Sequence, residues 1–598
     1  MTPSDSNVLR AHGRSKDGKR HRYWSLVETV RTPDGPRQRT LCYLGELNDS
    51  AQARWLKTME VFNENGQAQQ LMLFPSEVDA PANDPDVAQV LLKKVRLELT
   101  RQLGPCYLGW QLLQRLKLDE FFATTIDTDG ADVTWSRVTA ILAINRLCAP
   151  GSELAIEQRW YPSSALGDIL HIEEGQINDT RLYRYLDRIL PQKTKLEQHL
   201  KQRYGELFGA EFDGMLYDLT STYVEGDAKA NPRMRRGYSR DHRPDCLQLV
   251  LALIVNAEGF PCSYEVFHGN RADGTTMEVI LRTVERKYGK ARRIWVMDRG
   301  IGSEANLAAI RQREGQYLVG TPRSKRKEFE LYLKEEIHWE KGRDEVQVKL
   351  ISIPGGTETF MLCKTEGRQQ KEQAIRNRFS TRLEKALNSL QKQVKAGRLK
   401  NRDKVHVRIG RILASHPQVA DLYQVMGKEQ SGQLSLEWSA KEGQQQWRET
   451  REGAYLLRTN LTATTASELW EKYMQRTEVE AAFRALKSEL SIRPLFHQLE
   501  RRVKAHVMVA FLGYALWVTL KHLLAGKQSA WSASRALAEL ATLQSADIVL
   551  PTTDGREIRL RRVPEPTPEQ KQLLNELGIE LPNQLQFNQQ CSADFAVA

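Results

Sequence analysis

The first part of the chain carries two β-rich runs separated by turn-forming residues. The runs cover 22–30 and 37–44, and the segment between them, 32–36, reads TPDGP. Proline and glycine in that order set the backbone angles of a tight turn, so we expect a small basic β-hairpin. Residues 64–86 are polar and contain three prolines, which predicts a linker.

From about residue 87 to residue 210, apolar positions recur with the period of a helix. The clearest examples are 107–122, 134–148 and 180–207. Apolar residues spaced three and four apart form one face of a helix, and that face must pack against other helices. The pattern predicts an all-helical domain.

The pattern changes at residue 214, where strands begin to alternate with helices. We expect strands at 214–224, 247–256, 260–268, 292–298 and 316–321, helices at 275–289 and 303–314, and a basic loop at 233–243. Three antiparallel strands followed by alternating helix and strand is the element order of a ribonuclease-H-like α/β domain.

The alternation stops after residue 321. Residues 322–460 mix β-like pieces at 345–352, 357–363 and 454–459 with a long basic helix, which we interpret as a mainly β insertion. The predicted division is 1–63 hairpin module, 64–86 linker, 87–210 helical domain, 211–321 first part of the α/β core, 322–460 insertion, 461–524 second part of the core, and 525–598 small C-terminal unit.

Four polar residues after the insertion share one helical face. At about 100° per residue, Tyr473, Arg476, Glu480 and Lys487 fall within a stripe roughly 60° wide, and Arg484 lies near it. An apolar stripe beside them would anchor the helix to a core. For this helix alone, an ion-paired and solvated surface is an equally good interpretation.

Net charge changes the balance between these interpretations. The chain has a formal charge of +12 over 598 residues and a pI near 9.2. Such a surface attracts polyanions, of which nucleic acid is the commonest. A basic enzyme with another substrate remains open on charge alone.

Several classes of protein are disfavoured by what the sequence lacks. The seven cysteines are scattered, without zinc-binding spacing, and are expected to be reduced thiols in a cytoplasmic protein. The first residues do not resemble a secretory signal, and the apolar run 506–520 is too short to span a bilayer, so we expect a buried helix there. No phosphate-binding loop of the G-x4-G-K-[ST] type occurs, which disfavours an ATP-driven motor.

Three carboxylates in three different contexts predict a metal site. Asp218 lies inside the first core strand and Asp298 closes the fourth. If those strands are neighbours, the two carboxylates meet and repel unless a cation compensates them. Two Mg²⁺ ions about 3.5 to 4 Å apart would do so, with Glu480 completing the ligands. Taken singly, Asp218 is more simply a residue that caps a turn.

These residues carry a resemblance to a known family. The chain resembles DDE transposases of the insertion-sequence-four superfamily, whose signature Y-x2-R-x3-E-x6-K is met at Tyr473, Arg476, Glu480 and Lys487. The segments LYDLTSTYVEG and WVMDRGIGSEANL are similar to the family's two aspartate motifs, and GYSRDHRPD and YLLRTN are similar to further family segments. The resemblance spans roughly residues 20–580.

The resemblance implies an α/β architecture, with a ribonuclease-H-like catalytic domain interrupted by a mainly β insertion. It implies cleavage at transposon ends and joining of the freed 3′-hydroxyls to target DNA, with Mg²⁺ that Mn²⁺ could replace. The catalytic and metal-binding residues would be Asp218, Asp298 and Glu480. Tyr473, Arg476 and Lys487 would contact DNA phosphates. By its position Arg484 could add a contact, or equally could pair with Glu480 when DNA is absent.

The resemblance also implies partners. These are double-stranded DNA, as terminal inverted repeats and as target, and a second copy of the chain in a homodimer on DNA. No membrane and no nucleotide cofactor are expected, and the location would be a bacterial cytoplasm, at the nucleoid when DNA is bound. The helical domain is the best candidate for reading the repeats, although it contains no convincing helix-turn-helix.

Other interpretations remain open at this stage. Trp438 and Trp447 are candidates for stacking on a flipped base, but core packing explains them as simply. Each basic segment taken alone is more often solvated charge than a DNA contact. The protein could also be a ribonuclease-H-like nuclease that cuts without joining, or a catalytically inactive DNA-binding derivative.

Overall fold

The computed structural model describes residues 89–585 with short gaps, together with five strands between residues 7 and 72. The gaps are 129, 174, 230, 290–292, 335–338, 343–345, 354, 431–432, 463 and 554. The C-terminal residues 586–598 lie outside the described residues, as do 73–88, which include most of the predicted linker.

The structure has two paired strands where the N-terminal hairpin was predicted, together with a third strand. β2 (Lys19–Thr32) and β3 (Gly35–Glu46) pair antiparallel, and Thr32 is opposite Gly35. β1 (Asn7–Lys16) pairs with β2 and was missed because its residues are mostly polar. β4 (Thr58–Phe62) pairs with β5 (Ala68–Met72), so a strand lies within the segment predicted as linker.

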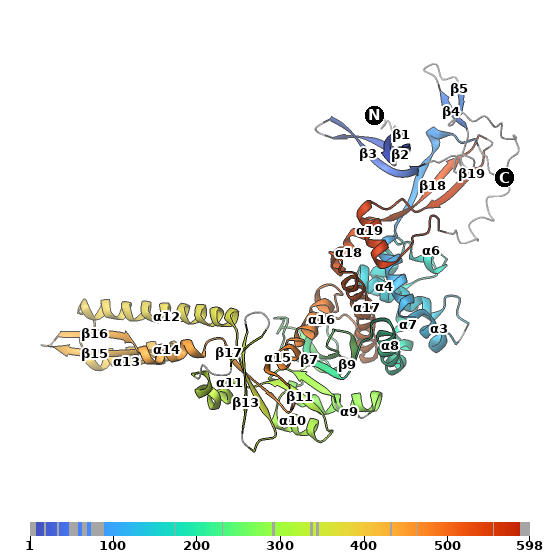
Figure 1. Cartoon of the computed structure of the whole chain (residues 1–598). Coiled ribbons are helices and arrows are strands. Elements are labelled where there is room, and N and C mark those ends of the chain that lie inside the picture. The colour runs from blue at the N-terminus through green and yellow to red at the C-terminus, as the bar shows by residue number, and fades with distance from the viewer. Residues whose placement is uncertain are drawn as a thin grey trace.

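A nine-stranded mixed sheet forms the centre of the molecule (Figure 1). Its order is β12-β13-β14-β17-β11-β10-β7-β8-β9. Five strands match the predicted runs closely: β7 (Gly214–Val224), β8 (Leu247–Val255), β9 (Pro261–His268), β10 (Ile294–Met297) and β11 (Gln316–Gly320). β7 and β10 are parallel neighbours, as the ribonuclease-H-like prediction required. Helices α9 (Met277–Tyr288) and α10 (Glu304–Arg311) occupy the predicted positions.

The insertion differs from its prediction. The segment was predicted to interrupt the core, but its strands β12 (Glu340–Lys341), β13 (Gln347–Ser352), β14 (Thr359–Lys364) and β17 (Ala454–Thr459) extend the central sheet. β17 pairs antiparallel with β11, so the chain returns to the core edge after the excursion. Between β11 and β12 lie α11 (Arg323–Arg326) and a 3-10 helix (Lys327–Leu333).

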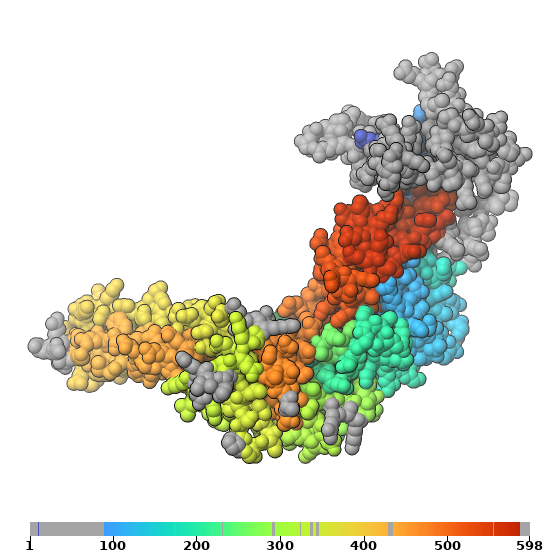
Figure 2. All heavy atoms as spheres, viewed as in Figure 1, coloured from blue at the N-terminus to red at the C-terminus, as the bar shows by residue number. Residues whose placement is uncertain are grey.

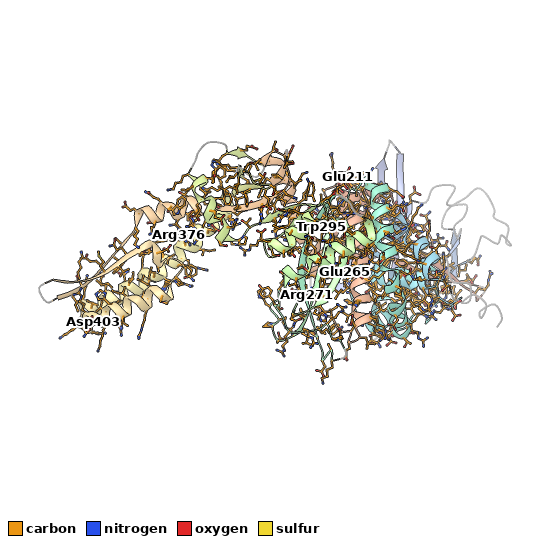
Figure 3. The ribbon with its side chains drawn as sticks, turned by 90° about the horizontal axis from the view of Figure 1, so that it is seen from below. Glu211, Glu265, Arg271, Trp295, Arg376 and Asp403 are labelled. Atoms are coloured by element: carbon orange, nitrogen blue, oxygen red, sulfur yellow. The ribbon has the colours of Figure 1, made fainter. Side chains whose placement is uncertain are left out.

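The rest of the insertion is a projecting arm that is mainly helical (Figures 1 and 2). It contains α12 (Glu366–Lys395), α13 (Arg402–Ser415), the hairpin β15 (Tyr423–Gln430) and β16 (Gln433–Ala440), and α14 (Glu442–Arg451). Figure 3 shows Arg376 on α12 and Asp403 farther out along the arm. Arg376 is buried and its Nε lies 2.8 Å from Glu452, which fastens the base of the arm.

The helical domain contains the predicted helices, but two of them are broken. Predicted 107–122 is α2 (Gly104–Arg115) and α3 (Leu118–Ile126), because Lys117 adopts a left-handed backbone with φ 51°. Predicted 180–207 is α7 (Asp179–Ile189) and α8 (Lys193–Phe208), with a 3-10 turn containing Pro191 between them. The predicted 134–148 helix is α4 (Trp135–Cys148), and α5 (Glu153–Ala155), a π-helical turn (Ile156–Trp160) and α6 (Leu166–Leu170) follow it.

The region from residue 87 to residue 210 was predicted to be all-helical but is not. β6 (Arg96–Gln102) lies in the predicted all-helical region but pairs with β18 (Gln544–Pro551), which pairs with β19 (Glu557–Arg562). The short 3-10 helix Leu92–Lys94 precedes β6, and α18 (Ala533–Leu540) and α19 (Pro568–Leu577) complete the C-terminal unit. Pairing between segments that far apart in sequence has no local signal.

One long apolar helix joins the parts. α17 (Glu500–Gly526) packs against α4, α7 and β9, and it contains the apolar run predicted to be a buried helix. Among the described residues it is the one helix long and apolar enough to cross a membrane. Because 78% of its most apolar window is buried inside the structure, it is a core helix here.

Candidate active site

The three predicted carboxylates come together at the centre of the sheet. Met297 of β10 is opposite Tyr217 of β7, so Asp298, the next residue, comes beside Asp218. Glu480 lies on α16 (Arg476–Ser488), which packs on β7 and β8. Two sheet neighbours and one covering helix therefore supply the three groups.

Arg476 connects two of these carboxylates. Its guanidinium nitrogens lie 3.1 Å from Asp298 and 2.8 Å from Glu480. Asp298 and Glu480 remain 46% and 45% exposed, so solvent and ligands can reach them. The guanidinium supplies the positive charge that carboxylates held this close require.

Asp218 is the most buried of the three. The pKa of its carboxyl is raised to about 6, chiefly by burial and to a smaller extent by the charge of Asp298, against the opposing effects of the Leu219 backbone amide, Arg476 and Arg240. Where burial has raised the pKa of a carboxyl, a bound cation restores the stability of its ionised form. Three carboxylates are hard oxygen donors of the kind that Mg²⁺ prefers, so the residues fit the ion that the sequence predicted.

The signature residues lie on two helices, where the sequence predicted one. Tyr473 belongs to α15 (Ala466–Met474), and α16 begins after Gln475. The chain tightens there because the amide of Glu478 donates to the carbonyl of Gln475, three residues back instead of four. Tyr473 still contacts Arg476, whose guanidinium lies 5.5 Å from the ring centre. The predicted apolar stripe is buried, at Val479, Phe483, Leu486 and Leu490.

Lys487 is held by a residue that the sequence analysis did not single out. Its Nζ lies 2.7 Å from Asp241, which is 3% exposed and also pairs with Arg493. Burial lowers the pKa of Lys487, while the Asp241 carboxylate opposes that shift. Asp241 belongs to the segment GYSRDHRPD, and the similarity of this segment to a family segment was the sequence signal that could have identified it. The same loop is fixed to β7, because the Arg240 amide donates to Ser221 Oγ at 2.8 Å.

The remaining predicted residues lie farther from the carboxylates or inside the arm. Arg484 is exposed and makes no ion pair with any described residue, so it does not pair with Glu480. Trp438 packs among apolar residues of the arm, including Leu436 and Leu422. Trp447 lies under the ammonium of Lys334, at 4.6 Å. For Trp438, core packing is therefore the interpretation that the contacts support.

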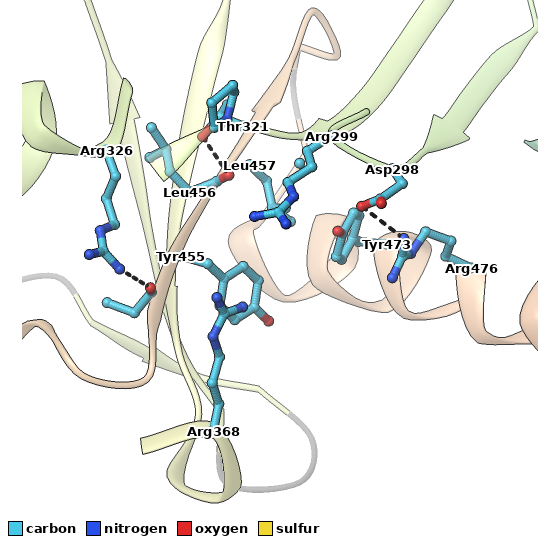
Figure 4. A pocket seen from close by; sticks show the side chains of 13 residues that line it. Asp298, Arg299, Thr321, Arg326, Arg368, Tyr455, Leu456, Leu457, Tyr473 and Arg476 are labelled. Carbon is cyan, nitrogen blue, oxygen red and sulfur yellow. Dashed lines mark hydrogen bonds and ion pairs between the residues drawn. The ribbon is translucent and has the colours of Figure 1, made fainter. Parts of the chain in front are cut away.

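A pocket of about 340 Å³ lies against Asp298 (Figure 4). Tyr473 and Arg476 line it together with Arg299, Arg326, Arg368 and Tyr455. Gly320 permits this arrangement, because a Cβ there would lie only 3.2 Å from the Tyr473 hydroxyl. Burial raises the pKa of Tyr473, so the phenol stays protonated and can donate a hydrogen bond.

A second cluster of ligand-type side chains connects α5 with α17 and the segment just before it. Glu153, His497 and His506 are buried, and their donor atoms lie within 4.8 Å of one another. His497 Nε2 is 3.3 Å from Glu153. Burial and the charge of Arg146, which lines the same cavity, lower the pKa of His506. A buried guanidinium beside the cluster already compensates Glu153 and disfavours a further cation.

Comparison with protein families gives two matches. The family model described as Transposase DDE domain matches residues 211–516, just over half of the chain. The model described as IS1634 family transposase, N-terminal domain, matches residues 9–68. That family is distinct from the superfamily that the sequence analysis named, so the finer assignment stays a prediction.

Comparison with individual proteins adds little. No curated protein matches the chain. Among solved structures, the Mos1 transposase paired-end complex with left transposon end is 11% identical, with 32% of this chain and 60% of that chain covered and a TM-score of 0.14. A pre-cleavage Mos1 transpososome is 12% identical, with 36% and 77% covered and a TM-score of 0.13. Scores this low carry no information about the site.

Proposed function

Because the chain belongs to the transposase DDE domain family, we propose that it cuts DNA at the ends of an insertion sequence and joins the freed 3′-hydroxyl ends to target DNA. The observation that carries this proposal is the meeting of Asp218, Asp298 and Glu480, from two strands and a helix, with Arg476 between two of them. We assign the core to the ribonuclease-H-like fold and keep the insertion-sequence-four superfamily as the proposed wider group.

Asp218, Asp298 and Glu480 would hold two Mg²⁺ ions. Bound there, the ions would activate the attacking oxygen and stabilise the leaving oxygen of the phosphodiester. Asp218 must be ionised to take part, and the adjacent positive charges of Arg476 and Arg240 favour that state. Arg476 must give up its two carboxylate partners in part, and a DNA phosphate is the natural new partner for a guanidinium.

Tyr473, Arg476, Lys487 and Arg484 are the proposed DNA contacts. Tyr473 can donate to a phosphate without adding charge, and Lys487 presents its ammonium at a position fixed by Asp241. The partners are double-stranded DNA and, on that DNA, a second copy of the chain. The net charge of +12 supports an acidic partner.

The decisive experiment removes each carboxylate separately. Plasmid excision and strand transfer are measured with Mg²⁺ for Asp218→Ala, Asp298→Ala and Glu480→Ala. Each should lose at least about a hundredfold, since even residues that only support metal ligands are worth 10 to 100-fold. Full activity in any one variant removes that residue from the site.

Glu478→Ala is the matched control for Glu480→Ala. It lies on the same helix but pairs with Lys521 at 2.7 Å, away from the other carboxylates. Its activity should stay near that of the unmodified protein. Labelled donor ends that never become linked to target DNA would instead favour a nuclease that cuts without joining.

A further inference from the structure

The pocket beside Asp298 gathers positive charge from four separate elements (Figure 4). Arg299 follows β10, Arg326 ends α11, Arg368 lies in the first turn of α12, and Arg476 begins α16. One carboxylate, Asp298, lines the pocket with them. The catalytic sheet and the base of the arm therefore share one cationic cavity.

The four guanidiniums differ in how far protein groups satisfy them. Arg476 pairs with Asp298 and Glu480, and Arg326 donates to the carbonyl of Ala454 at 2.6 Å. Arg299 is exposed and forms no ion pair with a described residue. Arg368 is 37% exposed and reaches Glu372 only at 3.3 Å. Arg299 and Arg368 therefore retain donors for a ligand.

The remaining walls suit a nucleotide unit better than a free small anion. Arg368 lies 4.9 Å above the ring of Tyr455, and Tyr473 lines the pocket next to Arg476 (Figure 4). Guanidiniums bind phosphate through paired hydrogen bonds, while aromatic rings pack against sugars and bases. A volume of about 340 Å³ is too large for a phosphate alone.

We propose that this pocket binds a backbone phosphate of the DNA strand, next to the phosphate that is being cut, with Arg299 and Arg368 as its phosphate-binding residues. The proposal rests on the proposed function, because it supplies the path of the strand leaving the carboxylates. The strand would then run from Asp298 toward the base of α12. Either element ends or target DNA could supply such a strand.

The test measures DNA binding without metal, so that cutting cannot interfere. Affinities of the full chain are measured in EDTA between about 50 and 200 mM salt. One duplex carries the sequence flanking the gene and another is unrelated. Because both arginines would bind the same phosphate, Arg299→Gln and Arg368→Gln should each lower the slope of log affinity against log salt, and the double variant should lower it by about one unit in all.

Arg282→Gln is the control. Arg282 is 74% exposed on α9 of the same domain and pairs with Glu278, outside the pocket. Its slope should not change. A lower slope on the flanking duplex alone assigns the pocket to element ends, and a lower slope on both duplexes assigns it to any DNA. Unchanged slopes for Arg299→Gln and Arg368→Gln on both duplexes overturn the proposal.

Two further outcomes separate this proposal from the proposed function. A protein that shows the slope changes but never cuts DNA with Mg²⁺ keeps the phosphate site and loses the transposase assignment. A protein that cuts and joins DNA, with slopes unchanged in both variants, keeps the assignment and loses the phosphate site. Both substituted residues are at least partly exposed, and thermal unfolding checks that each variant folds.

Discussion

Asp218 combines burial with a charge that the proposed chemistry requires. Its folded pKa of about 6 lies above the ordinary value of 3.8, chiefly because of burial. The folded protein therefore binds a proton more tightly than the unfolded chain does. Stability contributed by this group is present below about pH 4 and is lost as the pH rises through about 6.

Replacing Asp218 with Asn should therefore stabilise the metal-free protein above pH 6. The expected gain is on the order of 1 to 3 kcal/mol at pH 8 and about a third of that near pH 4.5. Thermal unfolding in EDTA at both pH values measures it. A variant as stable as the unmodified protein at pH 8 would show that the carboxylate is not strained by burial.

Asp241 illustrates a residue whose importance appears only in three dimensions. It is 3% exposed and faces Lys487 and Arg493, and its Oδ2 has no hydrogen-bond partner among the described residues. Asp241→Asn should cost about 3 to 5 kcal/mol, because it leaves two partly buried cations without their counter-charge.

Asp245→Asn is the comparison for that variant. Asp245 lies in the same loop but is 61% exposed and pairs only with Arg243 among charged groups. Denaturation midpoints of the two variants should differ clearly, with Asp245→Asn close to the unmodified protein. Equal midpoints would mean that the Asp241 ion pairs contribute little.

At the scale of elements, the sequence predicted the strands of the core within a few residues. Runs such as 247–255 are almost entirely apolar, as in a strand covered on both faces, so local pattern was sufficient. It failed where the fold depends on distant partners. β13, β14 and β17 were assigned to an insertion outside the core, although β17 pairs with β11 and β14 and β13 follow it in the same sheet.

The positions at which helices end were the other feature that the sequence pattern did not predict. Lys117, Pro191 and Gln475 interrupt stretches whose apolar period continues across them. At Lys117 a left-handed backbone turns the chain, and the sequence has no glycine there that would predict the turn. Tyr473, Arg476 and Glu480 stay close together despite the break at Gln475, because the next helix begins at Arg476.

The arm has its own small core, which should unfold locally when weakened. Leu383 and Leu387 of α12 are fully buried against Val419 and Leu422. Leu387→Ala should cost about 2 to 5 kcal/mol within the arm. Limited proteolysis or hydrogen exchange should show faster opening of residues 366–451, with the central sheet unaffected.

Ile375→Ala serves as its control. Ile375 is on the same helix but 41% exposed, so its truncation should leave the protection of the arm unchanged. If Leu387→Ala instead loosened the whole molecule at once, the arm and the sheet would form one cooperative unit.

At the scale of the whole molecule, the candidate site was more predictable than the domain layout. Three carboxylates and a helical signature are local patterns, and the parallel pairing of β7 with β10 brought them together. Asp241, Arg299 and Arg368 were not predicted, because single charged residues in loops and helix starts have no distinguishing pattern. Their roles depend on which distant elements meet.

Metal binding should stabilise the folded chain as a whole. At a Mg²⁺ concentration about a hundredfold above the dissociation constant, linkage gives about 2.7 kcal/mol. Glu480→Ala should lose most of this increase in unfolding temperature, whereas Glu478→Ala should keep it. The same increase in both variants would place the bound ion away from Glu480.

The 30-residue helix α12 has a mechanical consequence. At about 1.5 Å per residue it is a lever roughly 45 Å long. Its base is connected to the candidate site, because α12 starts directly after β14 of the central sheet and Arg368 in its first turn lines the pocket with Asp298. A small movement at the base of α12 would therefore displace its far end by a larger distance, and a force applied at the far end would act on the residues that line the pocket with Asp298.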